Sequence, residues 1–369
     1  MISAELSKVT CAVDENVAPL VDEALAELKI PEAYLQRGKQ SYLVERFGWF
    51  GLRSRTALAE ARARLYRLYV PRRFETGVMR RIAEAADLLL PGRGSIYAEA
   101  ATVLRAEPPA FDEALLDALG RGSGDLVARH CVVCCIVRRG MAADLARTVL
   151  EMGLCAPFVS FGEGMGLRNK LGLLRVTIPV EKEVIYFVVP ERDADLLEGV
   201  VVHKARLDRP GQGFIYRSRV RALAVNLRLR QGERRYAASM EQVIAALDEM
   251  RGSPDWRRLG PAAGRHGRGG PDADLACLSL VAEEGRVGEY VRIAMEAGAG
   301  GATLVPLERR IFAGGGGRSS HAREACDLIV PSGLAGEVLE AVEREAFFGE
   351  GGSGLAEISA VQRAVTYSG

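Results

Sequence analysis

The chain has 369 residues, 48% of them hydrophobic and 26% charged, and its 49 lysines and arginines almost balance its 48 aspartates and glutamates. The formal charge of +1 excludes a global field that would draw the protein to nucleic acid or to an anionic membrane surface. Because no apolar run reaches the roughly 20 residues that span a bilayer, and the N-terminal segment lacks a signal-peptide pattern, we expect a soluble cytoplasmic protein.

One spacing pattern occurs three times along the chain. A Val-Pro pair is followed, at the same distance each time, by a glycine that has a second glycine two residues before it. The prolines are Pro71, Pro190 and Pro331, and the glycine pairs are Gly92 with Gly94, Gly211 with Gly213, and Gly352 with Gly354. Three occurrences at one spacing indicate an internal repeat, so we expect three copies of one structural unit.

In the first third, apolar alternation predicts strands and apolar residues at helical spacing predict helices. The expected order is strand, helix, strand, strand, helix, strand, over residues 8–14, 17–28, 32–47, 63–70, 74–87 and 95–105. A linker over 108–127 follows, which begins with prolines and contains one short helix.

The middle third shows the same order most clearly. Its elements are expected over 131–139, 141–153, 156–164, 182–190, 191–207 and 214–227. Pro190 lacks a backbone donor and has a helical φ, so it can end a strand and begin a helix. An extension helix is expected near 236–250. The Arg-, Gly- and Pro-rich stretch over 251–272 buries too little apolar area to order itself, and a tether is preferred over an RNA-binding tract.

The last third repeats the order with weaker strands, over 275–284, 287–298, 301–313, 325–330, 334–345 and 355–367. The order β-α-β-β-α-β is that of the ferredoxin-like unit. The sequence therefore predicts an α+β protein of three tandem ferredoxin-like domains, over 1–107, 128–250 and 273–369.

The seven cysteines are expected to be reduced and buried. Cys131 and Cys134 have a spacing that suggests a metal or redox pair beside His130. Residues three apart on a strand point to opposite faces, however, so core packing is the preferred interpretation and no structural metal is expected.

Three motifs of the middle third occur in a characteristic order. They are the loop FGEGMG after the second strand, the third strand EKEVIYFVVP, and the turn LDRPGQGFIY before the fourth strand. With them the chain resembles the nitrogen regulatory protein P-II family over most of 130–230, and more faintly over 6–105 and 275–369. Proteins of that family are homotrimers of ferredoxin-like subunits that bind ATP or ADP between neighbours. The resemblance implies a monomeric, single-chain pseudo-trimer with three clefts.

The resemblance also implies a set of anion-binding residues. The paired glycines match the phosphate turn of the family, where the missing Cβ lets backbone N–H groups approach anionic oxygens. Lys182 matches a lysine that faces the effector, and Arg323 has the same offset before Pro331. Arg105 and Arg228 fall where the family has phosphate-binding arginines. The candidate ligand-binding residues are Gly92, Gly94, Arg105, Lys182, Gly211, Gly213, Arg228, Arg323, Gly352 and Gly354. ATP or ADP, accompanied by Mg, is the ligand that the resemblance implies.

In the family, the loop between the second and third strands reaches a partner protein. Here the first such loop carries Phe47, Trp49 and Phe50, which are candidate partner contacts because aromatics surrounded by arginine are typical of interface hot spots. The alternative is that they pack on their own third. The implied function is regulation of an unidentified enzyme or transporter, in nitrogen regulation.

Two other functions remain open from the sequence. One is a ligand-free assembly or scaffold protein with the same fold, and the other is an enzyme built on one inter-repeat cleft. The four histidines lie in different contexts, and none is placed beside a nucleophile and an orienting carboxylate in a recognisable pattern. No catalytic residue is therefore predicted, and a non-enzymatic role is preferred.

Overall fold

The computed structural model of the chain describes residues 2–47, 54–90, 92–120, 126, 129–165, 181–225, 230–231, 274–312, 319–348 and 354–366. The first third contains β1 (Ile2–Asp14), α1 (Ala18–Glu27), β2 (Glu32–Phe47), β3 (Ser54–Pro71), the short helix η1 (Arg72–Phe74), α2 (Glu75–Ala85) and β4 (Gly94–Arg105). The helix α3 (Glu113–Ala118) follows, and the side chain of Asp112 caps it by accepting from the Leu115 amide. The short helix predicted in the linker over 108–127 is thus confirmed.

The other two thirds follow the same order of elements. The middle third contains β5 (His130–Arg138), α4 (Ala142–Glu151), β6 (Phe158–Met165), β7 (Glu181–Pro190), α6 (Glu191–Ala205), β8 (Gly213–Val220), β9 (Ala222–Val225) and β10 (Arg230–Gln231). The last third contains β11 (Leu275–Glu283), α8 (Val287–Glu296), β12 (Ala302–Ile311), β13 (Ser319–Pro331), α9 (Ser332–Glu343), β14 (Leu355–Val361) and β15 (Arg363–Thr366). The helix expected near 236–250 and the tether at 251–272 lie outside the described residues.

The repeated prolines mark the same junction in each third. Pro71, Pro190 and Pro331 each end a strand and precede a helix, with φ of −54°, −55° and −54°. The ring of proline fixes φ near this value and removes the amide, so the ladder stops where the helix starts. The repeat seen in the sequence therefore reports a repeated local turn.

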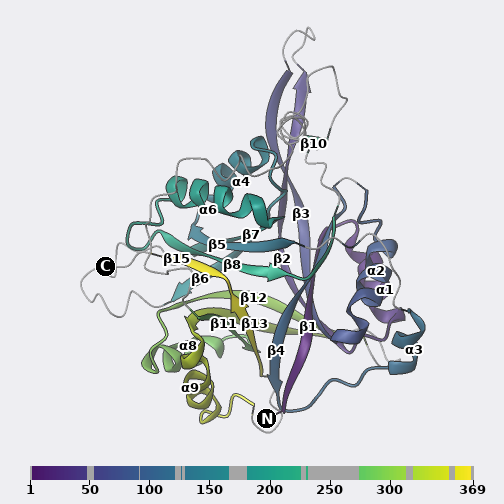
Figure 1. The fold of residues 1–369 in the computed structure, drawn as a ribbon, viewed down its shortest axis with the longest axis vertical. Coiled ribbons are helices and arrows are strands. Elements are labelled where there is room, and N and C mark those ends of the chain that lie inside the picture. The colour runs from purple at the N-terminus through teal and green to yellow at the C-terminus, as the bar shows by residue number, and fades with distance from the viewer. Residues whose placement is uncertain are drawn as a thin grey trace.

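The prediction of three separate ferredoxin-like domains forming a pseudo-trimer is wrong. The strands of all three thirds join in one sheet, and nine of them close into an antiparallel barrel, to which the other described strands and the seven described α-helices are added. Pairings between the thirds make this sheet continuous, because β4 pairs with β14 and β9, β8 pairs with β15, and β2, β6 and β12 pair with one another. Figure 1 shows the strands as one body.

Two predicted strands divide where the chain crosses to a neighbouring third. The strand expected over 214–227 breaks at Arg221, whose amide donates to Ala98 O over 2.8 Å. The strand expected over 355–367 breaks at Gln362, whose amide donates to Arg217 O over 2.8 Å. After each break the chain pairs with a strand of another third. Sequence periodicity cannot show which strand receives this pairing.

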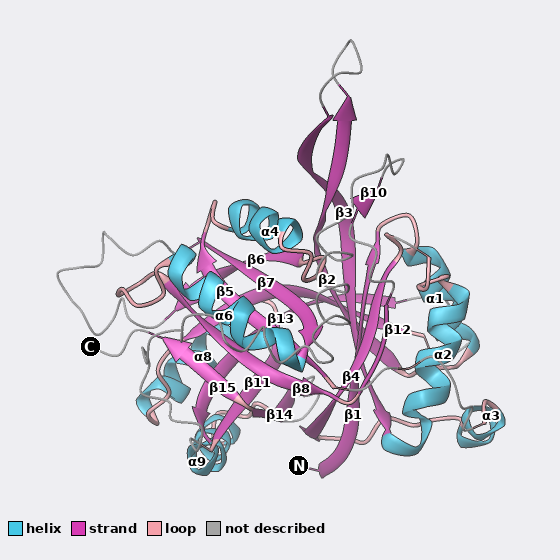
Figure 2. Cartoon of the chain, turned by 45° about the horizontal axis from the view of Figure 1, so that its top comes forward, coloured by secondary structure: helices cyan, strands magenta, loops and turns pink. Residues whose placement is uncertain are grey.

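The distribution of apolar side chains explains why the thirds do not form independent domains. Three outer cores lie between helices and sheet, one for each third, and the helices surround the strands in three groups in Figure 2. A fourth core lies inside and combines residues of all three thirds, including Tyr34, Phe158 and Leu307. In the described part of the chain, the inward face of each third is covered by the other two thirds, so the hydrophobic effect favours a single closed barrel.

Candidate functional site

The predicted turn glycines are explained by close packing against a neighbouring strand. Gly94 and Gly213 have φ of +141° and +134°, and a Cβ at either position would lie 2.1 Å from Ala12 O or 1.8 Å from Ile136 O. Gly92 and Gly211 also have positive φ, of 78° and 73°. The fold therefore requires glycine in these turns whether or not an anion binds there.

The same turn in the last third is described in part. A Cβ at Gly354 would lie 2.2 Å from Phe347 O, while Gly352 lies outside the described residues. Gly354 is thus also closely packed, but against the carbonyl of Phe347 in the segment after α9 and not against a strand.

Lys182 is a buried cation at the start of β7. The residue is 8% exposed, and its ammonium donates to Gly211 O over 3.3 Å, so the lysine reaches the predicted glycine turn. Burial lowers the pKa of Lys182 from its usual 10.5, and the neighbouring Arg138 lowers it further. Both causes disfavour the ammonium form, as expected for a buried cation that has no carboxylate partner in the described part of the chain.

Arg138 is the second cation of this site. It lies directly opposite Lys182 in the β5–β7 ladder, and its Nε is buried without a hydrogen-bond partner among the described residues. Among the described residues, neither Lys182 nor Arg138 forms an ion pair with a carboxylate. The neighbouring segment 166–180 contains Arg168, Lys170 and Arg175 and no aspartate or glutamate, so it has no carboxylate to offer.

The equivalent positions of the other two thirds are different. Arg323 is 8% exposed and donates to Ala322 O over 3.0 Å, but the residue opposite it on β11 is the carboxylate Glu283. In the first third the position holds Ala63, and the adjacent Arg64 pairs with Glu15. Within the described part of the chain, two cations without a carboxylate therefore face each other only in the middle third.

The structure assigns Arg105 to an ion-pair network that holds the first and last thirds together. Its guanidinium pairs with Glu32 at 2.7 Å, and Arg309 pairs with the other oxygen of Glu32 at 2.5 Å. Burial alone would raise the pKa of Glu32, but the two arginines outweigh burial and the pKa is lowered. A guanidinium committed in this way is a poor phosphate ligand. Arg228 lies outside the described residues.

One of the predicted partner contacts, Phe47, lies on a long hairpin. Strands β2 and β3 pair from Tyr34 with Arg67 out to Phe47 with Ser54, and the hairpin projects beyond the barrel (Figure 1). Phe47 ends β2, while Trp49 and Phe50 fall outside the described residues. Whether these aromatics contact a partner stays a prediction.

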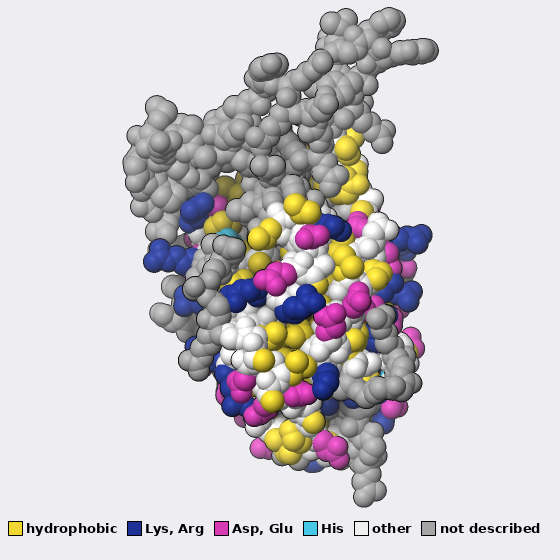
Figure 3. Space-filling model, turned by 90° about the vertical axis from the view of Figure 1, so that its right-hand side faces the viewer, with side chains coloured by type: hydrophobic (Ala, Val, Ile, Leu, Met, Phe, Trp, Pro, Cys, Tyr) yellow, Lys and Arg dark blue, Asp and Glu magenta, His cyan; other side chains and the backbone are white. Residues whose placement is uncertain are grey.

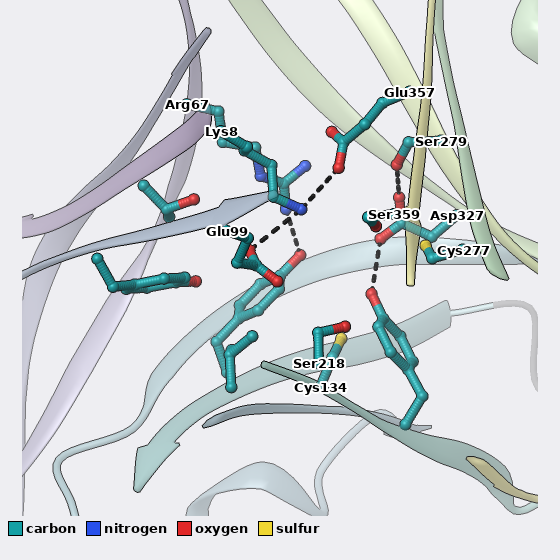
Figure 4. Close-up of a pocket in the computed structure, with 15 residues that line it drawn as sticks. Lys8, Arg67, Glu99, Cys134, Ser218, Cys277, Ser279, Asp327, Glu357 and Ser359 are labelled. Carbon is teal, nitrogen blue, oxygen red and sulfur yellow. Dashed lines mark hydrogen bonds and ion pairs between the residues drawn. The ribbon is translucent and has the colours of Figure 1, made fainter. Parts of the chain in front are cut away.

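A second polar cluster, which sequence reasoning missed, lies inside the barrel around a cavity of about 30 Å³. Five positions of each third line this cavity, and the strand registers make them equivalent. The equivalent sets are Lys8, Val132 and Cys277; Thr10, Cys134 and Ser279; Arg67, Tyr186 and Asp327; Tyr97, Tyr216 and Glu357; and Glu99, Ser218 and Ser359. We call these fifteen residues the barrel cluster; Figure 4 shows them directed toward one another.

Hydrogen bonds and ion pairs within and around the barrel cluster connect the three thirds. Lys8 pairs with Glu99 at 3.1 Å and with Glu357 at 2.8 Å. Arg67 donates to the hydroxyl of Tyr186 over 2.6 Å. In the same region Tyr69, next to the cluster on β3, donates to Glu357 over 2.7 Å. These contacts join the first third to each of the other two.

Asp327 is held by neutral hydroxyl groups. Tyr216 donates to it over 3.1 Å, and Ser279 also donates to it. The first of these bonds joins the middle and last thirds. The barrel cluster thus fixes which third lies beside which.

The size and chemistry of the cavity limit what it can do. A volume of about 30 Å³ suits about one water molecule and is far below the roughly 300 Å³ of an organic-ligand pocket. Burial raises the pKa of Cys134 to about 12, so its thiol stays protonated at neutral pH and is a poor nucleophile. The barrel cluster is therefore not built to hold an organic substrate.

Two expectations concern the cysteines: that they are buried, and that core packing is preferred over a metal site. All seven cysteines are buried, as predicted, and none of them forms a disulfide in the structure. Within the described residues, no group of three or more His, Cys, Asp or Glu side chains is placed to hold a metal ion.

Basic and acidic side chains are interspersed on the face shown in Figure 3. Ion pairs such as Arg81 with Glu27 and Lys29 with Asp112 occur on α1, α2 and their surroundings.

Comparisons with known proteins do not identify the chain. No protein-family model matches it, and no curated protein matches it. None of the described helices is long and apolar enough to cross a membrane.

Proposed function

We propose that this chain is a regulatory protein that binds one small anion at Lys182 and Arg138 in the middle third, and that anion binding controls its interaction with a partner. The observation that carries the proposal is the pair of facing cations, of which Lys182 is 8% exposed, without a carboxylate partner in the described residues. A buried charge without a counter-ion costs several kcal/mol, so a site of this kind gains stability when an anion occupies it.

The chemistry of the site favours a carboxylate or phosphate group. Lys182 offers a compact ammonium, and Arg138 offers a planar fork of N–H donors that suits two oxygens at once. The resemblance of the middle third to P-II proteins makes ATP and ADP, with Mg²⁺, the first ligands to test, and it alone supports a cytoplasmic role in nitrogen regulation. The projecting β2–β3 hairpin supports control of a partner, because it presents a long surface away from the barrel.

The test is a thermal-shift and calorimetric titration of the purified protein with phosphate, ATP and ADP with and without Mg²⁺, 2-oxoglutarate and bicarbonate. A ligand at a hundred times its Kd stabilises the protein by about 2.7 kcal/mol. We expect one anion bound per chain, with binding lost in Lys182→Met and in Arg138→Met. Lys204→Met is the matched control, because Lys204 is a lysine of the same third that is already paired with Asp144 at 3.2 Å.

Two outcomes would contradict the proposal. Binding that survives Lys182→Met would place the anion elsewhere in the chain. No stabilisation by any of the anions would favour the alternative of a ligand-free assembly protein.

A further inference from the structure

The barrel cluster contains more acidic than basic side chains. Glu99, Asp327 and Glu357 are its carboxylates, and Lys8 and Arg67 are its cations. The side chains of Glu99 and Glu357 are 6% and 3% exposed. If all five groups were ionised, the barrel would enclose an uncompensated negative charge, and burying such a charge costs several kcal/mol.

The contacts of the three carboxylates show which of them is the least stabilised as an anion. Asp327 accepts from two hydroxyl groups, those of Tyr216 and Ser279. Glu357 accepts from Tyr69 over 2.7 Å and pairs with Lys8 at 2.8 Å. These two carboxylates therefore have two donors each.

Glu99 has the weaker set of contacts. Among the described residues its carboxylate pairs with Lys8 alone, at 3.1 Å, and it shares that ammonium with Glu357. A proton placed on Glu99 removes the excess charge and leaves the stronger Lys8–Glu357 pair intact.

We propose that Glu99 carries a proton in the folded protein, and that this proton locks the seam between β4 and β14. Glu99 lies on β4 of the first third and Glu357 on β14 of the last third, with the Lys8 ammonium between them (Figure 4). The two strands pair from Arg105 with Leu355 to Thr102 with Ile358. When the proton leaves Glu99, two carboxylates on the two sides of the seam compete for one ammonium and repel each other.

The groups around Glu99 set the direction of its titration. Burial raises the pKa of Glu99 above its usual 4.5; the Glu357 carboxylate raises it further, while Lys8 and Arg67 oppose these effects without cancelling them. Glu99 in turn raises the pKa of Tyr97 and of Cys134, although burial is the main cause for both groups. Because the folded pKa of Glu99 is above its unfolded pKa, the contribution of Glu99 to stability is complete below the unfolded pKa and is lost as the pH rises through the folded pKa.

The experiment compares the wild type with Glu99→Gln from pH 5 to pH 9. One readout is the unfolding equilibrium in denaturant, and the other is amide hydrogen exchange at the seam, residues 102–105 and 355–358, corrected for the intrinsic pH dependence of exchange. The ladder between β5 and β7 is the internal reference. Glu5→Gln is the matched control, because Glu5 is an exposed glutamate of the neighbouring β1 that accepts from Thr102 of the same seam.

Between the unfolded and the folded pKa of Glu99, we expect the unfolding equilibrium constant of the wild type to increase about tenfold for each pH unit, relative to that of Glu99→Gln. The substituted protein lacks the titrating group and should not show this increase. Seam amides should lose protection over the same range, while the β5–β7 ladder keeps it. Glu5→Gln should follow the wild type. Equal pH dependence of the wild type and Glu99→Gln would overturn the proposal.

A second measurement tests the proposal without a substitution. In wild-type protein labelled with ¹³C at the glutamate carboxyls, the resonance of Glu99 should report a protonated group at pH 5 and should titrate above the usual range of glutamate. A Glu99 resonance that is already that of a carboxylate at pH 5 would also overturn the proposal.

Discussion

Arg309 on β12 and Glu32 on β2 form an ion pair of 2.5 Å that joins the last third of the chain to the first. Glu32 is 8% exposed, and its second oxygen pairs with Arg105 at 2.7 Å. One carboxylate therefore compensates two guanidinium groups at a seam of the barrel. Removing it leaves both cations without their shared partner.

We predict that Glu32→Gln destabilises the protein by about 3–5 kcal/mol, the usual loss when one partner of a buried ion pair is removed. Denaturant unfolding measures the change. The control is Glu27→Gln, which removes an exposed partner of Arg81 and should cost less than about 1 kcal/mol. Similar effects of the two substitutions would show that the Glu32 network does not hold the seam.

The same network predicts an acid-sensitive contribution to stability. Because Arg105 and Arg309 lower the pKa of Glu32 below its usual 4.5, the folded state binds its proton less readily than the unfolded state does. This contribution is complete above pH 4.5 and is lost as the pH falls through the folded pKa. Unfolding free energies measured between pH 2 and pH 6 should show this loss in the wild type and not in Glu32→Gln.

The turn at Gly213 predicts a large effect from adding a single methyl group. A Cβ there would lie 1.8 Å from Ile136 O at a φ of +134°, so Gly213→Ala must displace β5 or the turn. We expect a loss of about 4 kcal/mol or more, in the range of the most damaging substitutions. Gly140→Ala is the matched control, since Gly140 has a φ of +91° but no atom of the described residues within 4 Å of its Cβ position. It should cost about 1–2 kcal/mol, and equal losses would assign the effect to φ alone.

The crossing of strands from two thirds predicts a similar sensitivity at Gly162. Gly162 lies on β6, opposite Lys182 of β7. A Cβ at Gly162 would lie 2.4 Å from Leu304 O of β12. We expect Gly162→Ala to destabilise the protein by about 3 kcal/mol, because backbone atoms of another strand must move. Thermal unfolding measures the loss, and a change below about 1 kcal/mol would show that β12 accommodates the methyl group.

The lowered pKa of Lys182 predicts how anion affinity depends on pH, if the proposed site is occupied. Only the ammonium form attracts an anion, and burial together with Arg138 shifts the pKa below 10.5. Affinity should therefore fall as the pH rises through this lowered pKa, and the fall should begin at lower pH than for an exposed lysine. Calorimetric titration with phosphate checks this, and Lys182→Arg, which stays charged, should remove the pH dependence. An affinity that is constant up to pH 10 would argue against a role for Lys182.

The sequence determined the local structure well. The order strand, helix, strand, strand, helix, strand is found in each third, and Pro71, Pro190 and Pro331 each precede a helix as predicted for Pro190. These features depend on the apolar period and on the fixed φ of proline, which act between neighbouring residues. The repeated spacing also marks Gly94, Gly211 and Gly213 as positions of special importance. For Gly94 and Gly213, the structure shows that the cause is close packing against β1 and β5.

Only the tertiary structure decided how the thirds combine. Lys8, Glu99 and Glu357 lie on three different strands, β1, β4 and β14. A charged residue within a strand is typical of a solvent-exposed face, yet these three line the interior of the barrel. The alternation of residues along a strand shows that its two faces differ in polarity, but it does not show which face is buried inside a barrel. Likewise, Arg105 pairs with Glu32 and Lys182 lies opposite Arg138 because of pairings between segments far apart in the chain. Such long-range pairings leave no local pattern, so the barrel, its buried charges and the uncompensated cation pair became visible only in the folded chain.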